Sequence, residues 1–162
     1  MLAVASVLAA CGDGGFRPVH GDIGIAANVS EKLKQVDVAT IPSRVGQQVR
    51  NELIFATTGG GTAETAVYRL EIAIRERLTS ALVEKTGEAR SRIYVLDANF
   101  KLVSIKDKKV LLTGTSYARA GLETYKSIFS NVRARRDAED RAARTVGADI
   151  KTRVSAFLAS PV

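Results

Sequence analysis

The sequence is poor in the residues that build metal centres and disulfides. Its 162 residues include one cysteine, Cys11, and one histidine, His20, and they contain no tryptophan. A single cysteine cannot form an intramolecular disulfide or a cysteine-based zinc site. A single histidine likewise excludes a histidine-rich metal site or a pair of catalytic imidazoles. We therefore expect the protein to work with neither a metal nor another cofactor.

The sequence also lacks a constellation of catalytic residues. His20 precedes the predicted domain, so it is a poor candidate for the base of a serine hydrolase. Glu139 and Asp140 are adjacent on a predicted helix and point in different directions. The glycines at 59–61 are not followed by the Lys-Ser/Thr pair of a phosphate-binding loop, which favours a connector. Two pairs at i,i+4 spacing are predicted as surface ion pairs: Asp137 with Arg141, and Asp140 with Arg144. The sequence thus predicts a protein that is not an enzyme.

What the chain has in excess is positive charge. Lys and Arg number 24 against 17 Asp and Glu, which gives a net charge of +7 and a pI near 9.8. Hydrophobic residues make up 46% of the chain and charged residues 25%, as in an ordinary globular domain. The length fits one domain. This balance favours anionic partners, which include nucleic acid, membrane headgroups and phosphorylated ligands.

The N-terminus carries a signal of its own. Residues 1–10 are small or apolar and uncharged, and they resemble the second half of a secretory signal peptide. The segment Leu8–Cys11 resembles a bacterial lipobox, in which the cysteine becomes the first mature residue and carries acyl chains. We therefore expect lipidation at Cys11, and Gly12 after it resembles the sorting signals that permit outer-membrane delivery. The alternative is a buried structural cysteine in an ordinary apolar start.

The rest of the chain divides into a leader and one domain. Residues 11–32 are glycine-rich without a sustained period, and we expect a lipidated N-terminus and an extended leader there. A single domain is expected over residues 33–162. It opens with a short strand at 36–40, and Ser43 can cap an amphipathic helix whose apolar positions run from Val45 to Ala56.

Three alternating segments and a long helix follow. Apolar residues recur at period two around 68–74, 94–102 and 111–117, which predicts an antiparallel meander with one covered and one wet face. A long helix is predicted from about Ser127 to Leu158. The expected fold is therefore an α+β two-layer sandwich, with two helices on one face of a four-stranded, mainly antiparallel sheet in the order β-α-β-β-β-α.

Three clusters of basic residues fall at the ends of these elements. The clusters are Lys85, Arg90 and Arg92 near the first strand turn, Lys106, Lys108 and Lys109 at the next hairpin tip, and Arg133, Arg135 and Arg136 early in the last helix. Each cluster alone can be a solvated face. If several clusters meet at one edge of the sheet, their cations could pair with phosphates through charge-assisted hydrogen bonds.

Taken together, the motifs resemble the LptE family of lipopolysaccharide-assembly lipoproteins, in its alphaproteobacterial form. Leu8–Gly12 followed by Gly15–Gly21 is similar to the family's Cys-Gly-Phe-Arg-Pro-Leu-Tyr-Gly opening, although extra residues around Asp13 interrupt it here. Ile41–Leu53 resembles its first-helix pattern Arg-x-Gly-Gln-x-Leu-Arg-Asn-x-Leu. The alternation Asp137-Ala138 and Arg141-Ala142 in the last helix also fits.

The resemblance implies a function and a location. It implies a lipid-anchored protein on the periplasmic side of the outer membrane that plugs the LptD β-barrel and helps insert lipopolysaccharide into the outer leaflet. Lys85 and Arg136 are the best candidates for binding lipopolysaccharide by their position in the pattern, and Arg90 and Arg92 are further candidates.

Two other classes of function compete with this one. A periplasmic structural lipoprotein could use its basic patch on anionic lipid or peptidoglycan without a barrel partner. A nucleic-acid-binding module would explain the charge, but the lipobox exports the chain away from nucleic acid and stacking aromatics are sparse. We therefore expect no nucleic-acid partner.

Overall fold

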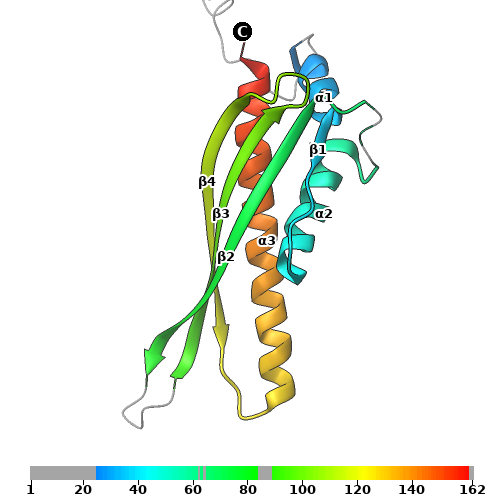
Figure 1. Ribbon diagram of the computed structural model, residues 1–162. Coiled ribbons are helices and arrows are strands. Elements are labelled where there is room, and N and C mark those ends of the chain that lie inside the picture. The colour runs from blue at the N-terminus through cyan, green and yellow to red at the C-terminus, as the bar shows by residue number, and fades with distance from the viewer. Residues whose placement is uncertain (1–24, 62, 64, 84–88, 161–162) are drawn as a thin grey trace, which may run out of the picture.

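The computed structural model describes residues 25–61, 63, 65–83 and 89–160. These residues form helices packed on a four-stranded sheet (Figure 1). In chain order the elements are α1 (Ile25–Lys34), β1 (Val36–Val38), α2 (Arg44–Thr58), β2 (Tyr68–Val83), β3 (Ala89–Ser104), β4 (Val110–Glu123) and α3 (Ile128–Ala159). Residues 1–10, Cys11 and Lys85 lie outside the described residues, so the predicted signal peptide and lipidation site stay predictions.

The sheet has the order β1-β2-β3-β4, so each strand lies beside its neighbour in the sequence. β1 pairs with β2 in parallel, and the other two pairs are antiparallel. A parallel pair needs a crossover connection, which α2 supplies. The predicted α+β sandwich with a mainly antiparallel sheet is confirmed, and its strand-helix-three-strands-helix order is present.

One helix was not expected from the sequence. The prediction of an extended leader fails for residues 25–32, because Ile25–Lys34 form α1. Val29 and Leu33, four residues apart, are both buried in the core. Lys32 also donates a hydrogen bond from Nζ to the carbonyl oxygen of Leu158 in the last turn of α3, at 3.1 Å. Ile25, Val29 and Leu33 recur every four residues, so the sequence did carry the helical period of α1, and contacts with α3 hold the helix in place.

The bounds of α2 follow from its end residues. Ser43 caps the helix by accepting a hydrogen bond from the Gly46 amide, and Gly59 ends it in the left-handed conformation at φ 74°. Glycine adopts that conformation without the steric cost of a side chain. A β-carbon at Gly46 would lie only 2.7 Å from Cγ2 of Ile41, so glycine also lets the first turn pack on the preceding loop.

Each long strand turns one row of side chains toward the helices. On β2 and β3 this is the row that the alternation predicts, but on β4 the predicted row, 111–117, is wrong: Tyr117 is 70% exposed, and the alternate residues face the helices. The buried row is Leu70 and Ile72 on β2, Tyr94, Leu96, Ala98, Phe100 and Leu102 on β3, and Ser116, Ala118 and Ala120 on β4. The strands run longer than the alternation indicated. Their pairing continues past the apolar row, through Leu78 opposite Tyr94 and Ser80 opposite Arg92.

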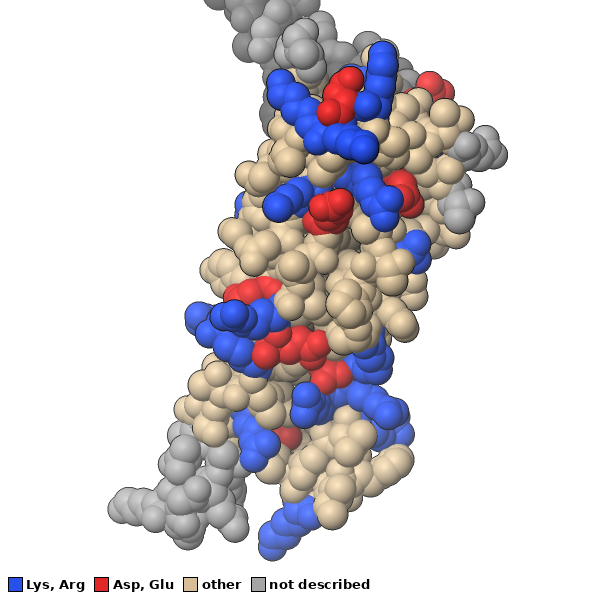
Figure 2. Space-filling model, viewed as in Figure 1, with Lys and Arg blue, Asp and Glu red and all other residues tan. Residues whose placement is uncertain are grey.

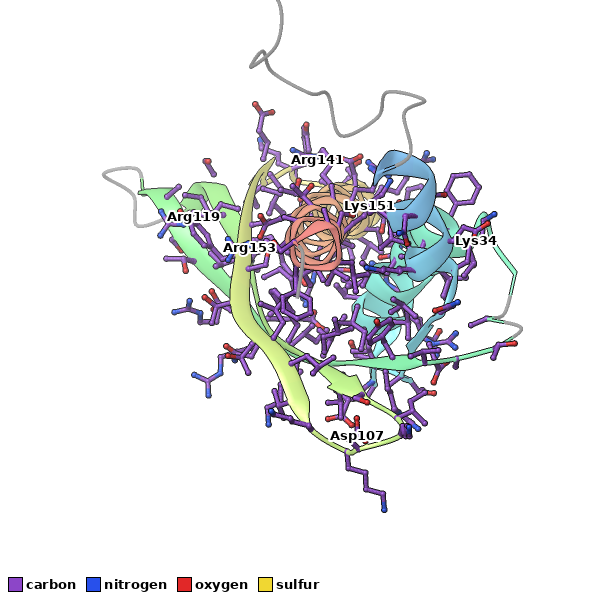
Figure 3. The ribbon with its side chains drawn as sticks, turned by 90° about the horizontal axis from the view of Figure 1, so that it is seen from above. Lys34, Asp107, Arg119, Arg141, Lys151 and Arg153 are labelled. Atoms are coloured by element: carbon purple, nitrogen blue, oxygen red, sulfur yellow. The ribbon has the colours of Figure 1, made fainter. Side chains whose placement is uncertain are left out.

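α3 lies close to β4 and to α2 because small residues line both contacts. Ala138, Ala142 and Ala143 of α3 are buried, as are the small side chains of β4. A β-carbon at Gly147 would lie 3.1 Å from Cβ of Glu52 on α2. Seen along α3, the other helices lie on one side of it and the sheet curves around the rest (Figure 3).

The sandwich has two distinct ends. The upper end in Figure 1 holds α1, the turn between β3 and β4, and the C-terminal end of α3. The lower end holds the far ends of β2 and β3 and the start of α3. We use "upper end" and "lower end" in this sense below.

Candidate ligand-binding groove

A wide groove opens at the lower end, between the last residues of β4 and the first half of α3. Its volume is about 930 Å³. It is lined by Gly121, Leu122, Glu123, Tyr125, Phe129, Ser130, Val132, Arg133, Ala134, Arg136, Asp137, Asp140 and Arg141. The groove exists because β4 and α3 are joined by a short connection and diverge below the small-residue contact that holds them together.

Three arginines of α3 line this groove. Arg141 joins its two walls: Nε donates to Asp137 at 2.9 Å, and Nη2 donates to the carbonyl oxygen of Gly121 at 2.8 Å. Figure 3 shows Arg141 beside the end of β4. Arg133 and Arg136 are exposed, and neither forms an ion pair with another described residue. Two cations thus face solvent without an anionic partner from the described part of the chain.

Arg92 reaches the same region from the sheet. It lies opposite Leu122 of the groove wall in the β3–β4 register, on the row that faces the helices. Residues directly opposite each other on neighbouring strands have β-carbons about 5 Å apart. The guanidinium is half-buried, and its buried Nε has no hydrogen-bond partner among the described residues. The predicted residues Arg92 and Arg136 are therefore brought to the same end of the molecule.

The other two predicted residues are less defined. Arg90 belongs to β3, at the lower end, but its side chain is outside what the structure describes, and Lys85 is outside altogether. Arg135, from the third basic cluster, is excluded from the groove lining because its Nε donates to Glu139 at 2.8 Å.

Apolar side chains are the part of this site that the sequence analysis missed. Ile128 and Phe129, in the first turn of α3, are 82% and 70% exposed, and Val132 and Tyr125 are about half exposed. Large apolar side chains exposed together indicate a binding surface. The signal was present in the sequence, since these residues precede the buried stripe of α3 and have no place in it.

The loop before α3 holds this apolar surface in place. Asn131 accepts a hydrogen bond from the Tyr125 amide at 2.6 Å and donates one to the Tyr125 carbonyl oxygen at 2.8 Å. Ser127 caps α3 by accepting from the Ser130 amide. The Tyr125 hydroxyl donates to Glu123, and this hydrogen bond raises the pKa of Tyr125 above its usual value. The groove therefore has a fixed rim.

A polar layer separates the groove from the apolar core. Glu139, which is only 6% exposed, accepts hydrogen bonds from Arg135 and from Arg44 of α2. The hydrogen bond to Glu139 raises the pKa of Arg44. Beside it, Asp140 contacts Arg44 and Gln48, rather than the expected Arg144. These contacts tie the start of α2 to α3 at the level where the groove begins.

The groove combines cationic side chains with exposed apolar side chains. This combination suits an amphipathic anion, whose phosphates would contact the arginines and whose hydrocarbon would contact Phe129 and its neighbours. The described residues contain no cluster of three or more acidic, histidine or cysteine side chains that could hold a metal ion. None of the described helices is both long enough and apolar enough to cross a membrane.

Comparison with solved structures shows the same fold in bacterial lipoproteins. A lipoprotein from Caulobacter crescentus CB15 superimposes with a TM-score of 0.71 at 17% identity, over 85% of this chain and 100% of that one. Lipoprotein B from Nitrosomonas europaea has a TM-score of 0.58 at 15% identity, over 75% and 82%. A minor lipoprotein from Acinetobacter baumannii has 0.54 at 15%, over 76% and 94%. No curated protein sequence matches the chain.

These structures share the sandwich architecture, so the fold is that of a class of bacterial lipoprotein domains. The family follows from the sequence itself. Residues 33–154 match the family model described as LptE, lipopolysaccharide-assembly, which covers most of the chain. The chain belongs to the LptE family, and the resemblance seen in its motifs is confirmed.

Proposed function

We propose that this protein is an outer-membrane lipoprotein that binds lipopolysaccharide at the lower-end groove and acts as the partner of an LptD-type β-barrel. In this proposal Cys11 carries the lipid anchor on the periplasmic side, and the sandwich helps the barrel to assemble and lipopolysaccharide to reach the outer leaflet. Membership of a lipopolysaccharide-assembly family supports the pathway. The groove supports the proposal that lipopolysaccharide is the ligand.

One observation carries the ligand proposal: exposed cations and exposed apolar side chains share one groove. Arg133 and Arg136 stand on α3 beside Phe129 and Val132. Lipid A presents phosphates next to acyl chains, so a single groove can meet both parts of it. Hydrogen bonds from guanidinium groups to phosphate are charge-assisted and often bidentate, which suits arginine better than lysine here. Arg92 would add a fourth cation from the sheet.

The ligand is tested by measuring binding of purified lipopolysaccharide to the full chain and to single variants. Arg136→Ala should weaken binding about tenfold, since it removes one charge-assisted contact of roughly 1.5 kcal/mol. The matched control is Arg144→Ala, because Arg144 is also an exposed arginine of α3 but lies outside the groove lining. Equal losses in the two variants would show that net charge, and not the groove, holds the ligand.

The partner is tested by a mild-detergent pulldown of the tagged protein from its native membrane, followed by mass spectrometry. We expect a large LptD-type barrel at near-equal stoichiometry. A membrane-bound protein without a barrel would overturn the partner proposal and leave a structural lipoprotein that works on anionic lipid or peptidoglycan. Cys11→Ala should release the protein from membranes washed in high salt once any barrel has been stripped, which tests the lipid anchor separately from electrostatic attachment.

A further inference from the structure

The upper end of the molecule carries a second cationic surface, far from the groove. The turn between β3 and β4 holds Lys106, Lys108 and Lys109, all exposed, which we call the lysine tip. None of the three forms an ion pair with another described residue. Figure 2 shows basic side chains gathered at the upper end of the face in view.

The one acidic residue of this turn is used internally. Asp107 accepts a hydrogen bond from Ser104 Oγ at 3.3 Å, and its own amide donates to the same oxygen at 3.4 Å. This closes the turn, and Lys108 takes the left-handed conformation at φ 53° within it. Figure 3 shows Asp107 at the edge of the molecule, on the side of the sheet away from α3. The turn thus holds its lysines outward on a fixed backbone.

Apolar side chains surround the lysine tip. Ile105 and Val110 flank the turn, and Val67 is bound to it by a hydrogen bond from the Ile105 amide to the Val67 carbonyl oxygen at 3.0 Å. All three side chains are exposed. The combination of ammonium groups on flexible stems with short apolar side chains suits the interface of a bilayer, where hydrocarbon enters the headgroup layer and the charges stay among the phosphates.

The positive charge continues onto the outer face of the sheet. A hollow of about 500 Å³ next to the tip is lined by Arg69 and Glu71 of β2, Lys101 of β3 and Lys108 of the tip. The surface formed by the tip and this hollow therefore has five basic side chains and two acidic ones, Asp107 and Glu71. Such a surface is complementary to an anionic partner.

The lysine tip lies at the same end of the molecule as α1, the first described element. The Val67 amide donates to the carbonyl oxygen of Gln35, directly after α1, at 3.0 Å, so the turn and the end of α1 meet through Val67. Only 13 residues lie between Cys11 and Ile25 at the start of α1. A chain of that length spans at most about 50 Å. A lipid on Cys11 would therefore keep the upper end within that distance of the membrane.

We infer that the lysine tip binds the anionic phospholipid surface of the membrane that carries the anchor, as a second, electrostatic attachment beside the lipid. The inference rests on the proposed function in one respect only, the identity of the membrane that the lysine tip contacts. Basic side chains beside an anionic leaflet add an electrostatic attraction to the attachment that the acyl chains supply. A lysine close to an anionic leaflet strengthens partitioning about fivefold, so three lysines should together give about a hundredfold.

The experiment measures how vesicles bind the full chain with Cys11→Ala, which cannot be lipidated. The vesicles contain phosphatidylcholine with or without 30% phosphatidylglycerol (roughly the anionic content of a charged leaflet). The tip variant is Lys106→Gln/Lys108→Gln/Lys109→Gln. The matched control is Arg75→Gln/Lys126→Gln/Arg144→Gln, which removes the same charge from three exposed sites away from the tip. Circular dichroism melting confirms that both variants fold.

We expect the protein to bind the anionic vesicles. The tip variant should lose about a hundredfold in affinity, whereas the control should largely keep its affinity. Rising salt should weaken binding. Equal losses in tip variant and control, or equal binding to neutral vesicles, would overturn the inference. So would a tip variant that loses only lipopolysaccharide binding, which would make the tip a second ligand site. The vesicles contain neither barrel nor lipopolysaccharide, so this result can be interpreted even if the pulldown finds no barrel.

Discussion

Gly114 of β4 lies directly opposite Phe100 of β3, and the aromatic ring fills the space above the glycine. The two residues are paired in the sheet register, and Phe100 is fully buried. A β-carbon at Gly114 would lie 2.5 Å from Cζ of that ring. The absence of a side chain at one position therefore determines where the largest apolar ring of the core sits.

The first prediction concerns this pair. Gly114→Val should lower the free energy of unfolding by about 1–3 kcal/mol, because the ring must leave its position in a filled core. Gly121→Ala is the matched control on the same strand, since nothing lies within 4 Å of a β-carbon there. Its effect should stay within about 0.5 kcal/mol. Urea denaturation measures both, and similar losses would contradict the role given to the ring.

The second prediction concerns Glu139, the buried carboxylate that accepts from Arg44 and Arg135. Glu139→Ala should cost about 2–3 kcal/mol, since hydrogen bonds to a charged group are lost and α2 is released from α3 at that level. Asp149→Ala is the control, because its ion pair with Arg153 is exposed and has the same i,i+4 spacing on the same helix. Such pairs contribute less than about 0.5 kcal/mol. Equal losses of unfolding free energy in the two variants would show that the contacts of Glu139 stabilise the protein no more than an exposed ion pair does.

The third prediction is a loss of stability in alkali. Burial, and then the hydrogen bond to Glu76, raise the pKa of Tyr94 above its usual value of about 10. The stability that neutral Tyr94 supplies is therefore complete below about pH 10, where unfolded tyrosine is also neutral, and is lost as pH rises toward the folded-state pKa. Tyr94→Phe should flatten this fall, and Tyr117→Phe, at an exposed site, should leave it in place. Denaturation at several pH values checks the difference.

The fourth prediction separates binding from stability in the groove. Phe129→Ser should leave the unfolding free energy nearly unchanged, because Phe129 is 70% exposed, yet weaken lipopolysaccharide binding by about 1 kcal/mol, or roughly fivefold, through lost apolar burial. Phe55→Ser is the matched control: Phe55 is 71% exposed but lies on α2, outside the groove lining. A Phe129 variant that binds as well as the control would exclude acyl chains from that part of the groove.

The sequence predicted the elements that begin and end at specific residue types. α2 runs between Ser43 and Gly59, and α3 starts after Ser127, because a cap must satisfy backbone groups that the helix leaves free. The antiparallel meander of β2, β3 and β4 was also predicted, because short turns join three alternating segments, but the parallel pairing of β1 with β2 was not. α1 was overlooked because Ile25, Val29 and Leu33, which carry its period, directly follow a glycine-rich segment that favours an extended chain.

The candidate site was predicted in part. Arg92 and Arg136 were predicted from their charge. That they lie at the same end of the molecule depends on β4, because Leu122 pairs with Arg92 and lines the groove together with Arg136. No sequence pattern encodes such a register. The exposed Phe129 was overlooked because an apolar residue in a helix is first expected in the core.

The length of α3 has a consequence for the whole arrangement. Its 32 residues rise about 48 Å, at 1.5 Å per residue, and they connect the lysine tip end to the groove end in one rigid rod. A bilayer with its headgroups is about 40–45 Å thick. If the proposed barrel holds the domain upright with its upper end at the inner surface, the start of α3, where the groove opens, would lie near the opposite surface. In that arrangement, shortening α3 by two turns would leave the start of α3 inside the depth of the membrane.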